Sequence, residues 1–428
     1  MSYRIAGIDV HKKMIVVVIA DVMSEGAEYD FEQRKFGATP TELQILAEWM
    51  TQQEVQEAVM ESTAQYWKPV WGALERYWTP ECKKREGAGP MSGTLHLAQA
   101  KSNRGPKGRK NDFADAQRLV KRLAAQELVL SFVPPPEQRL WRTVTRKKYQ
   151  LTRQVVQVKN QLEAFLEETH IKLSSLISDL LGVSGRRILK ALAEGETDPA
   201  SLANLADQRL RATTAQLRDA LGACTDLNAV YRRLLKMTLE QLRLLEEQIE
   251  QLEKECAGLL RAQRDAVERL AEVPGLGVDS AQQIIAEVGA DAANFESAKD
   301  FSSWVGVCPG EEETAGESRS SRSPKGNRNL RRLLNQGAQC AVRVKGSIFE
   351  LTFRRQLPRL GWKAAIWAIA HRLGRLVWKL LHDGVRYIEK GPAVSERSKK
   401  ARTARMIKEL RAIGYHVQPL NPEMGAAR

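Results

Sequence analysis

The segment RIAGIDV at residues 4–10, followed by MIVVVIAD at residues 14–21, decides the first part of the fold. Both runs are rich in Ile and Val, and a short polar turn of one His and two Lys separates them. Apolar β-branched runs of this length, joined by a polar turn, predict a β-hairpin. Asp9 stands at the end of the first run, where the apolar neighbours give no obvious reason for a charge.

The residues that follow predict a sheet covered by helices. Residues 29–37 (YDFEQRKFG) are a candidate third strand, and residues 39–53 have helical spacing. A short apolar strand at residues 55–61 (VQEAVME) ends at Glu61, and residues 66–77 read as the next helix. This order of strands and helices predicts a mixed α/β domain.

A loop rich in Gly and Lys comes next and leads into a helix. The loop KSNRGPKGRK contributes five cations, namely Lys101, Arg104, Lys107, Arg109 and Lys110. The segment NDFADAQRLVKRLAAQ at residues 111–126 predicts a helix with Asn111 or Asp112 at its N-terminus. Three consecutive prolines at residues 134–136 then break the chain. We therefore expect a first domain over residues 1–135.

The remainder of the chain is mainly helical in pattern. Apolar residues keep a heptad-like spacing near both ends of residues 136–268, which predicts two long helices that pair as an antiparallel hairpin or self-associate. A C-terminal domain is expected over residues 269–390, opening on PGLG (residues 274–277), a helix-hairpin-helix-like turn or an ordinary turn between helices. Residues 391–428 form a basic tail.

The charge of the chain is concentrated in its last quarter. Residues 318–411 hold 24 Lys and Arg against five acids, a net charge of +19. The whole 428-residue chain carries +14, so the rest of it is negative at −5. This asymmetry is typical of a nucleic-acid-binding protein, although a solvated basic surface has the same composition.

Cysteine usage and hydropathy narrow the class of protein. The five cysteines form no C-x-x-C pair, which argues against a zinc site or a disulfide framework and fits a reducing cytoplasm. No signal-peptide pattern and no run of 18 apolar residues occurs. We therefore expect a cytoplasmic, nucleoid-associated protein without a membrane partner.

Four carboxylates are candidates for catalysis. Asp9 and Glu61 end predicted strands, and Asp112 and Asp115 share one face of the first turn of a helix. Each has an ordinary structural explanation when taken alone. If they converge, their charges need compensation, and oxygen ligands of this kind select Mg²⁺ or Mn²⁺. Two such ions support phosphodiester chemistry, as in a ribonuclease-H-like fold.

The segment at residues 314–332 combines hydroxyl groups with positive charge. It holds five Ser or Thr residues, including Thr314 and Ser318, in what reads as a basic loop. Its cations are candidate phosphate contacts, namely Arg319, Arg322, Lys325, Arg328, Arg331 and Arg332.

Several motifs together resemble the DEDD transposases of bacterial insertion sequences. GIDVHKK, MESTAQYW and KNDFADAQRL are similar to the acidic motifs of that family. LGVSGRRILKALAEGETDPASLANLA is similar to its mid-chain helical region. VPGLGVDSAQQIIAEVG, FSSWVGVCPG and SPKGNRNLRRLLNQGA resemble its C-terminal transposase domain. The resemblance runs from about residue 3 to residue 390.

The resemblance implies a fold, a chemistry and partners. The first domain would be RuvC-like, with Asp9, Glu61, Asp112 and Asp115 holding Mg²⁺. The C-terminal domain would supply a serine nucleophile that forms a covalent link to DNA. A structured bridge RNA would pair with donor and target DNA. The protein would act as a homo-oligomer, a dimer or tetramer, with composite active sites built from different subunits.

The chain departs from the family pattern at the expected nucleophile. The family has Ser-x-Gly a few residues after its CPG element, whereas Thr314 stands here before Ala315-Gly316. Three readings stay open: Thr314 is the nucleophile, Ser318 or a nearby serine replaces it, or this copy is impaired.

Three functions are compatible with these features. The first is a transposase that cuts and rejoins DNA with a protein hydroxyl as nucleophile. The second is a RuvC-like endonuclease, such as a junction resolvase, that uses water. The third is a non-catalytic nucleic-acid-binding scaffold, which would not need the four acids.

Overall fold

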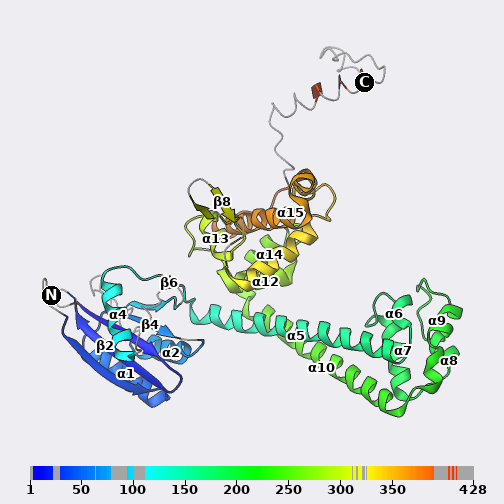
Figure 1. The fold of residues 1–428 in the computed structure, drawn as a ribbon, viewed down its shortest axis with the longest axis horizontal. Coiled ribbons are helices and arrows are strands. Elements are labelled where there is room, and N and C mark those ends of the chain that lie inside the picture. The colour runs from blue at the N-terminus through cyan, green and yellow to red at the C-terminus, as the bar shows by residue number, and fades with distance from the viewer. Residues whose placement is uncertain are drawn as a thin grey trace. The chain divides into compact units, whose positions relative to one another are not determined.

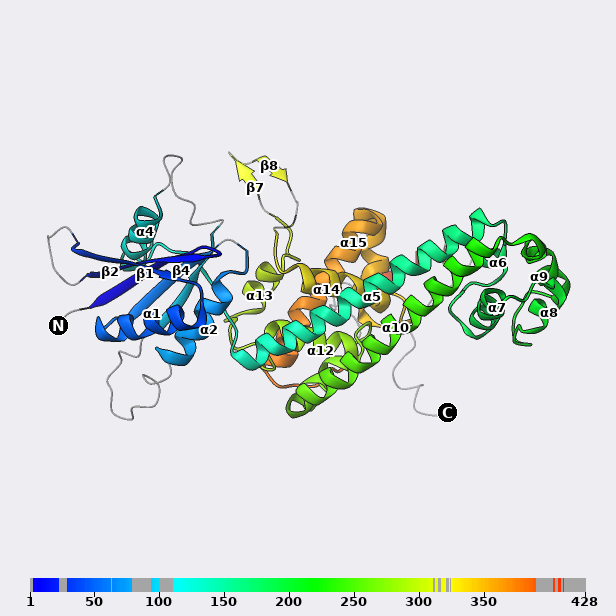
Figure 2. The same ribbon diagram turned by 90° about the horizontal axis from the view of Figure 1, so that it is seen from below.

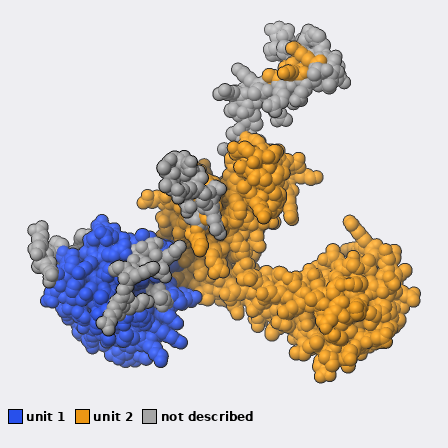
Figure 3. All heavy atoms as spheres, viewed as in Figure 1, with its two compact units in different colours: residues 1–134 blue, residues 135–428 orange. Residues whose placement is uncertain are grey.

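The structure of the chain is a computed structural model that divides into two compact units, residues 1–134 and residues 135–428 (Figure 3). It describes residues 3–22, 29–62, 64–78, 94–100, 111–310, 312–314, 317–320, 323, 325–389, 403–404, 407–408 and 411. At residues 62, 312–314 and 317–320 only the backbone is described.

A six-stranded mixed sheet forms the centre of the first unit (Figure 1). Its strands lie in the order β3-β2-β1-β4-β5-β6. β1 pairs antiparallel with β2 and parallel with β4, so the two strands that end in Asp9 and Glu61 are neighbours. The strands are β1 (Arg4–Val10), β2 (Met14–Asp21), β3 (Phe31–Gly37), β4 (Glu57–Ser62), β5 (Thr94–Ala98) and β6 (Leu130–Ser131).

Helices cover both faces of this sheet, as Figure 2 shows. Residues 6, 8 and 10 of β1 pack with α1 (Pro40–Gln52) and α2 (Trp67–Tyr77) on one face. The alternate residue Ile5 packs with α4 (Asp112–Ala124) on the other. Successive side chains of a strand point to opposite faces, so Asp9 belongs to the α4 face.

Two long helices form an antiparallel pair in the second unit (Figure 1). The direction follows from contacts at both ends of α5 (Pro136–Glu168) and α10 (Ala229–Leu259). Lys148 of α5 lies 3.1 Å from Glu253 near the end of α10, whereas Glu168 at the end of α5 accepts a hydrogen bond from Tyr231 near the start of α10.

A small helical bundle joins the two long helices and shares a hydrophobic core with them. It consists of α6 (Leu173–Leu176), α7 (Val183–Glu194), α8 (Pro199–Asn204), α9 (Thr214–Ala220) and the 3-10 helix η1 (Gly222–Asp226).

The C-terminal helices share another core, to which Trp141 of α5 also belongs. They begin with the 3-10 helix η2 (Arg261–Gln263) and continue through α11 (Arg264–Ala271), α12 (Val278–Val288), α13 (Ala298–Val305), α14 (Arg328–Ala341) and α15 (Ile348–His382). The predicted order of an α/β part followed by a mainly helical part is confirmed. No helix of the described residues is both long and apolar enough to cross a membrane.

The PGLG turn between α11 and α12 packs against α14. Gly275 has a φ of +86°, and a Cβ there would lie 2.2 Å from the carbonyl oxygen of Gly337. Leu276 of the same turn is buried. Close helix packing therefore explains this glycine, because any larger residue would separate the turn from α14.

The stretch around Thr314 differs from the expected loop. β7 (Glu312–Thr314) and β8 (Glu317–Ser320) pair antiparallel, with Thr314 opposite Glu317. The sequence signal for these strands is weak because each has only three or four residues, most of them polar.

Candidate active site

Two predicted site residues are direct partners in the sheet. Asp9 at the end of β1 lies in register with Glu61 at the end of β4. The strands are parallel, so both carboxylates leave the same edge of the sheet on the same face. This arrangement confirms the expected adjacency of the two strand ends.

Helix α4 brings two more carboxylates to this edge. A Cβ on Gly7 would lie 2.2 Å from the carbonyl oxygen of Ala116, so β1 admits a very close approach of the helix. Asn111 caps α4 by accepting a hydrogen bond from the backbone N–H of Phe113. Asp112 and Asp115 are therefore free of the capping role that the sequence allowed for Asp112, and their charges favour the first turn of the helix.

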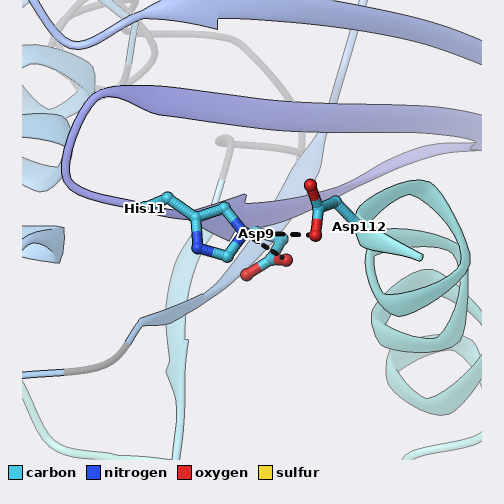
Figure 4. A group of neighbouring side chains, drawn as sticks. All are labelled: Asp9, His11 and Asp112. Carbon is cyan, nitrogen blue, oxygen red and sulfur yellow. Dashed lines mark ion pairs between the residues drawn. The ribbon is translucent and has the colours of Figure 1, made fainter. Parts of the chain in front are cut away.

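His11 connects the strand to the helix, as Figure 4 shows. Its Nε2 lies 3.2 Å from Oδ2 of Asp9 and 3.4 Å from Oδ1 of Asp112. One oxygen of each carboxylate and a ring nitrogen of His11 all lie within 4.8 Å of one another. The sequence analysis treated His11 only as part of a polar turn. Its position within GIDVHKK, two residues after Asp9, was the signal available.

Arg118 connects the other two carboxylates. Its Nη1 donates to Oδ1 of Asp115, and its Nη2 lies 3.8 Å from Oε2 of Glu61. Oε2 of Glu61 and Nε of Arg118 are both buried, and neither has a hydrogen-bond partner among the residues that the structure describes. The sequence analysis did not select Arg118, one helical turn after Asp115. The four acids are thus held as two pairs, one by His11 and one by Arg118.

The surroundings of Asp9 and Glu61 disfavour the ionised form of both carboxyl groups. Burial raises the pKa of Asp9, and the charges of Asp115 and Asp112 raise it further, although His11 opposes them. Burial also raises the pKa of Glu61, with Arg118 opposing and Asp9 and Asp115 adding to the effect. The charges of the four acids therefore act on one another through space.

These residues fit a divalent metal ion of the hard class. The donors are carboxylate oxygens, the ligand type that Mg²⁺ and Mn²⁺ prefer. The Glu61 oxygen without a hydrogen-bond donor and the raised pKa values of Asp9 and Glu61 are features that a bound cation would relieve.

A second polar cluster lies in the C-terminal part of the chain. Glu287 at the end of α12 is 2% exposed and receives two hydrogen bonds from Arg146 of α5, at 2.7 and 2.8 Å. Asn327 and Asn329 each donate to it at 2.9 Å. Arg142 donates to the backbone carbonyls of residues 286 and 287. The cluster holds the segment after the β7–β8 hairpin against α5.

Two transposase family models match this chain, one in its N-terminal part and one in its C-terminal part. Residues 6–171, which include all four acids, match the DEDD_Tnp_IS110 transposase model. Residues 267–353, which include the β7–β8 hairpin, match the model described as the transposase IS116/IS110/IS902 family. The chain belongs to the IS110-type DEDD transposases. Its N-terminal domain therefore has the ribonuclease-H-like fold of that family.

Three curated proteins are similar to this transposase. A transposase for insertion sequence element IS1328 of Yersinia enterocolitica is 27% identical over 65% of the chain and 73% of the relative. A probable family 20 transposase of Pseudomonas aeruginosa is 32% identical over 41% of the chain and 54% of the relative. A putative transposase y4pF/y4sB of Sinorhizobium fredii is 26% identical over 65% of the chain and 64% of the relative.

The cations predicted to contact phosphate differ in their exposure and in their neighbours. Lys325 and Arg328 are exposed, whereas Arg331 lies over the ring of Trp367 and Arg332 lies 3.6 Å from the ring centre of Tyr149. Arg332 also donates to two glutamine side chains. The five cations of residues 101–110 and Arg322 lie outside the described residues, and Arg319 is described only as backbone in β8.

Proposed function

We propose that this transposase cuts and rejoins DNA by metal-assisted phosphoryl transfer. The observation that carries the proposal is the register of Asp9 with Glu61, with the first turn of α4 placed over the same strand ends. A scaffold would not need four acids at one edge of a sheet. A bound Mg²⁺ or Mn²⁺ ion would supply charge neutralisation at the scissile phosphate.

The residues of the site would have different roles in this reaction. Asp9, Glu61, Asp112 and Asp115 would hold the ions. His11 and Arg118 contact the same carboxylates, and the guanidinium of Arg118 compensates part of their negative charge. Lys325 and Arg328, exposed beside the hairpin, would contact DNA phosphates and position the strand.

The nucleophile would be a hydroxyl group of the β7–β8 hairpin. Thr314 ends β7 and Ser318 lies in β8, so both residues belong to one small hairpin. The Glu287 cluster supports this assignment because it anchors Asn327 and Asn329, which follow the hairpin in the chain. The alternatives are attack by Ser318, or hydrolysis by water in a RuvC-like endonuclease.

The nucleophile is testable by trapping its DNA adduct. Wild-type protein incubated with labelled DNA ends should give a protein–DNA band that survives a denaturing gel. Thr314→Ala should lose the band, while Thr314→Ser should keep it because the attacking oxygen is retained. Ser318→Ala is the matched control and should keep it as well. Loss of the band in Ser318→Ala alone would assign the role to Ser318, and cleavage without any adduct would favour water.

The remaining organisation is proposed from the family resemblance. We expect a RuvC-like domain at residues 1–135, a helical region at 136–268, a C-terminal transposase domain at 269–390 and a basic tail at 391–428. DNA would be the donor and target, and a structured RNA would guide target choice. The antiparallel α5–α10 pair offers a long surface on which copies could associate into a dimer or tetramer.

RNA guidance predicts a discrete co-purified transcript. Protein isolated from its host under native conditions should carry one structured RNA encoded beside its own gene. A matched preparation of an unrelated basic protein should carry only a mixture of abundant RNAs. If sequencing finds the same mixture in both preparations, the guide proposal is wrong, whatever the outcome of the adduct experiment.

A further inference from the structure

An open groove lies along the last long helix, and its lining residues differ from those discussed above. α15 is interrupted at Gly361, where φ is 73° and ψ is 168°, so it consists of two helical segments. Residues from both segments line one groove of about 830 Å³, together with the chain that follows the helix. A groove of this size admits a few nucleotides of one strand and is too small for a duplex.

Three cations form a stripe on the wall of this groove. Arg372, Arg375 and Lys379 line it and are exposed. Their spacing of three and four residues places them on one face of α15, about 4.5 and about 6 Å apart along the axis. None of the three has a carboxylate partner among the residues that the structure describes. Such a row of unpaired cations matches successive phosphates of one strand.

The other charged groups at the groove are already engaged. Glu389 accepts hydrogen bonds from the Tyr387 hydroxyl and the Ile348 backbone N–H. Arg386 pairs with Glu272 and Asp265. Asp383, at the end of α15, pairs with its neighbour His382. The three cations outnumber the one lining carboxylate, Glu389, so the groove is positively charged overall.

The floor of the groove suits the faces of nucleobases. Val385 and Ile388 are exposed, and Leu376 and Tyr387 are partly exposed, so these four lining residues offer apolar and aromatic surface. Phe349 and Leu380 also line the groove, but they are buried.

We propose that this groove binds a short unpaired segment of nucleic acid, with phosphates on Arg372, Arg375 and Lys379 and bases against its apolar floor. The basic tail after residue 390 is a poor occupant because it carries the same sign of charge. The proposal rests on the proposed DNA-handling role, but it requires neither bound metal nor a protein nucleophile.

The test measures binding without catalysis. Full-length protein carrying Asp9→Asn is titrated, in buffer with EDTA, into fluorescein-labelled single-stranded DNA, RNA of the same sequence and the DNA duplex. Fluorescence anisotropy gives each affinity at several salt concentrations. Because no strand is cut, failure of the metal-dependent chemistry leaves this result unchanged.

The expected result is a selective loss of single-strand binding. Arg372→Gln with Arg375→Gln should weaken it about tenfold and lower the salt slope by roughly 1.4, since each lost phosphate contact contributes about 0.7. Arg359→Gln with Lys363→Gln removes the same charge from exposed positions of α15 outside the groove and should have a much smaller effect. Ala368→Trp, which fills the groove without changing charge, should also weaken single-strand binding.

Several outcomes would overturn the proposal. One such outcome is that both double variants lose the same amount of single-strand affinity. Another is that Arg372→Gln with Arg375→Gln weakens binding of duplex and single strand equally. Either result would mean that these cations act only through the overall positive charge of the protein. Unchanged binding in Ala368→Trp, with its fold verified by circular dichroism, would exclude the groove itself. A change of oligomeric state in sedimentation, without a change in oligonucleotide affinity, would identify a surface between copies instead. The DNA and RNA arms show which strand the groove prefers.

Discussion

Replacing Asp9 by asparagine is expected to reduce DNA cleavage and strand transfer by about a thousandfold or more. Asp9 is half-buried beside Glu61, Asp112 and His11, and it contributes one of the oxygens that would hold the metal ion. Losing a metal ligand removes several kcal/mol of transition-state stabilisation, and about 4 kcal/mol corresponds to that factor. DNA binding should change little, because most of the proposed phosphate contacts are made by other residues.

Although Asp9→Asn should lose activity, its thermal stability without metal should increase. The raised pKa of Asp9 means that the folded, metal-free protein holds the proton more tightly than the unfolded chain. Ionisation therefore costs stability at neutral pH, and the neutral Asn should raise the Tm slightly in EDTA. Mg²⁺ should raise the Tm of the wild type but not that of Asp9→Asn. A loss of activity with a gain in metal-free stability would exclude misfolding as the cause.

Glu57→Gln is the matched control for Asp9. Glu57 is a half-buried carboxylate at the opposite end of β4, where Tyr3 and His96 contact it at 2.7 Å. Its replacement should lower the Tm while leaving cleavage and the Mg²⁺ response in place. Full activity in Asp9→Asn, or equal loss in Glu57→Gln, would reject the proposed site.

Replacing Glu287 by alanine is expected to destabilise the C-terminal part of the chain by about 3 kcal/mol. The side chain is buried, so its removal leaves Arg146 and the amides of Asn327 and Asn329 without their shared acceptor. It also removes the ion-pair partner of Arg142. For a unit of this size that corresponds to a fall in apparent Tm of about 6 °C or more. Thermal unfolding followed by circular dichroism measures it.

The pH dependence of the same variant has a defined sign. Burial alone would raise the pKa of Glu287, but the hydrogen bonds and charge of Arg146, with Asn327 and Arg142, lower it below its ordinary value. Stability from this group is therefore present above the unfolded pKa of roughly 4.3 and is lost as the pH falls through the folded pKa. The Tm difference between wild type and Glu287→Ala should shrink below about pH 4.

An exposed glutamate on a neighbouring helix provides the control. Glu250 of α10 pairs with Lys254 at the surface, so Glu250→Ala should leave the Tm nearly unchanged. If Glu250→Ala and Glu287→Ala have the same Tm, the buried cluster is not the anchor described above. Reduced adduct formation in Glu287→Ala, relative to Glu250→Ala, would show that the cluster also positions the hairpin.

Much of the fold was predictable because its signals are local. The Ile and Val runs of β1 and β2, the heptad spacing of α5 and α10 and the proline break near residue 134 each involve residues close together in the chain. The short hairpin β7–β8 was not predicted, because three or four polar residues per strand carry no periodic signal.

By itself the sequence determined the order of elements, the concentration of charge in the last quarter and the identity of four candidate carboxylates. Only the tertiary structure decided that Asp9 and Glu61 are partners in register, that His11 and Arg118 bind the four acids in pairs, and that Glu287 is buried among cations. The reason is physical: helical and strand periodicity depends on neighbours in the chain. Charge compensation depends on distance in space, and it joins residues far apart in the chain, such as Arg142 and Glu287, which are 145 positions apart.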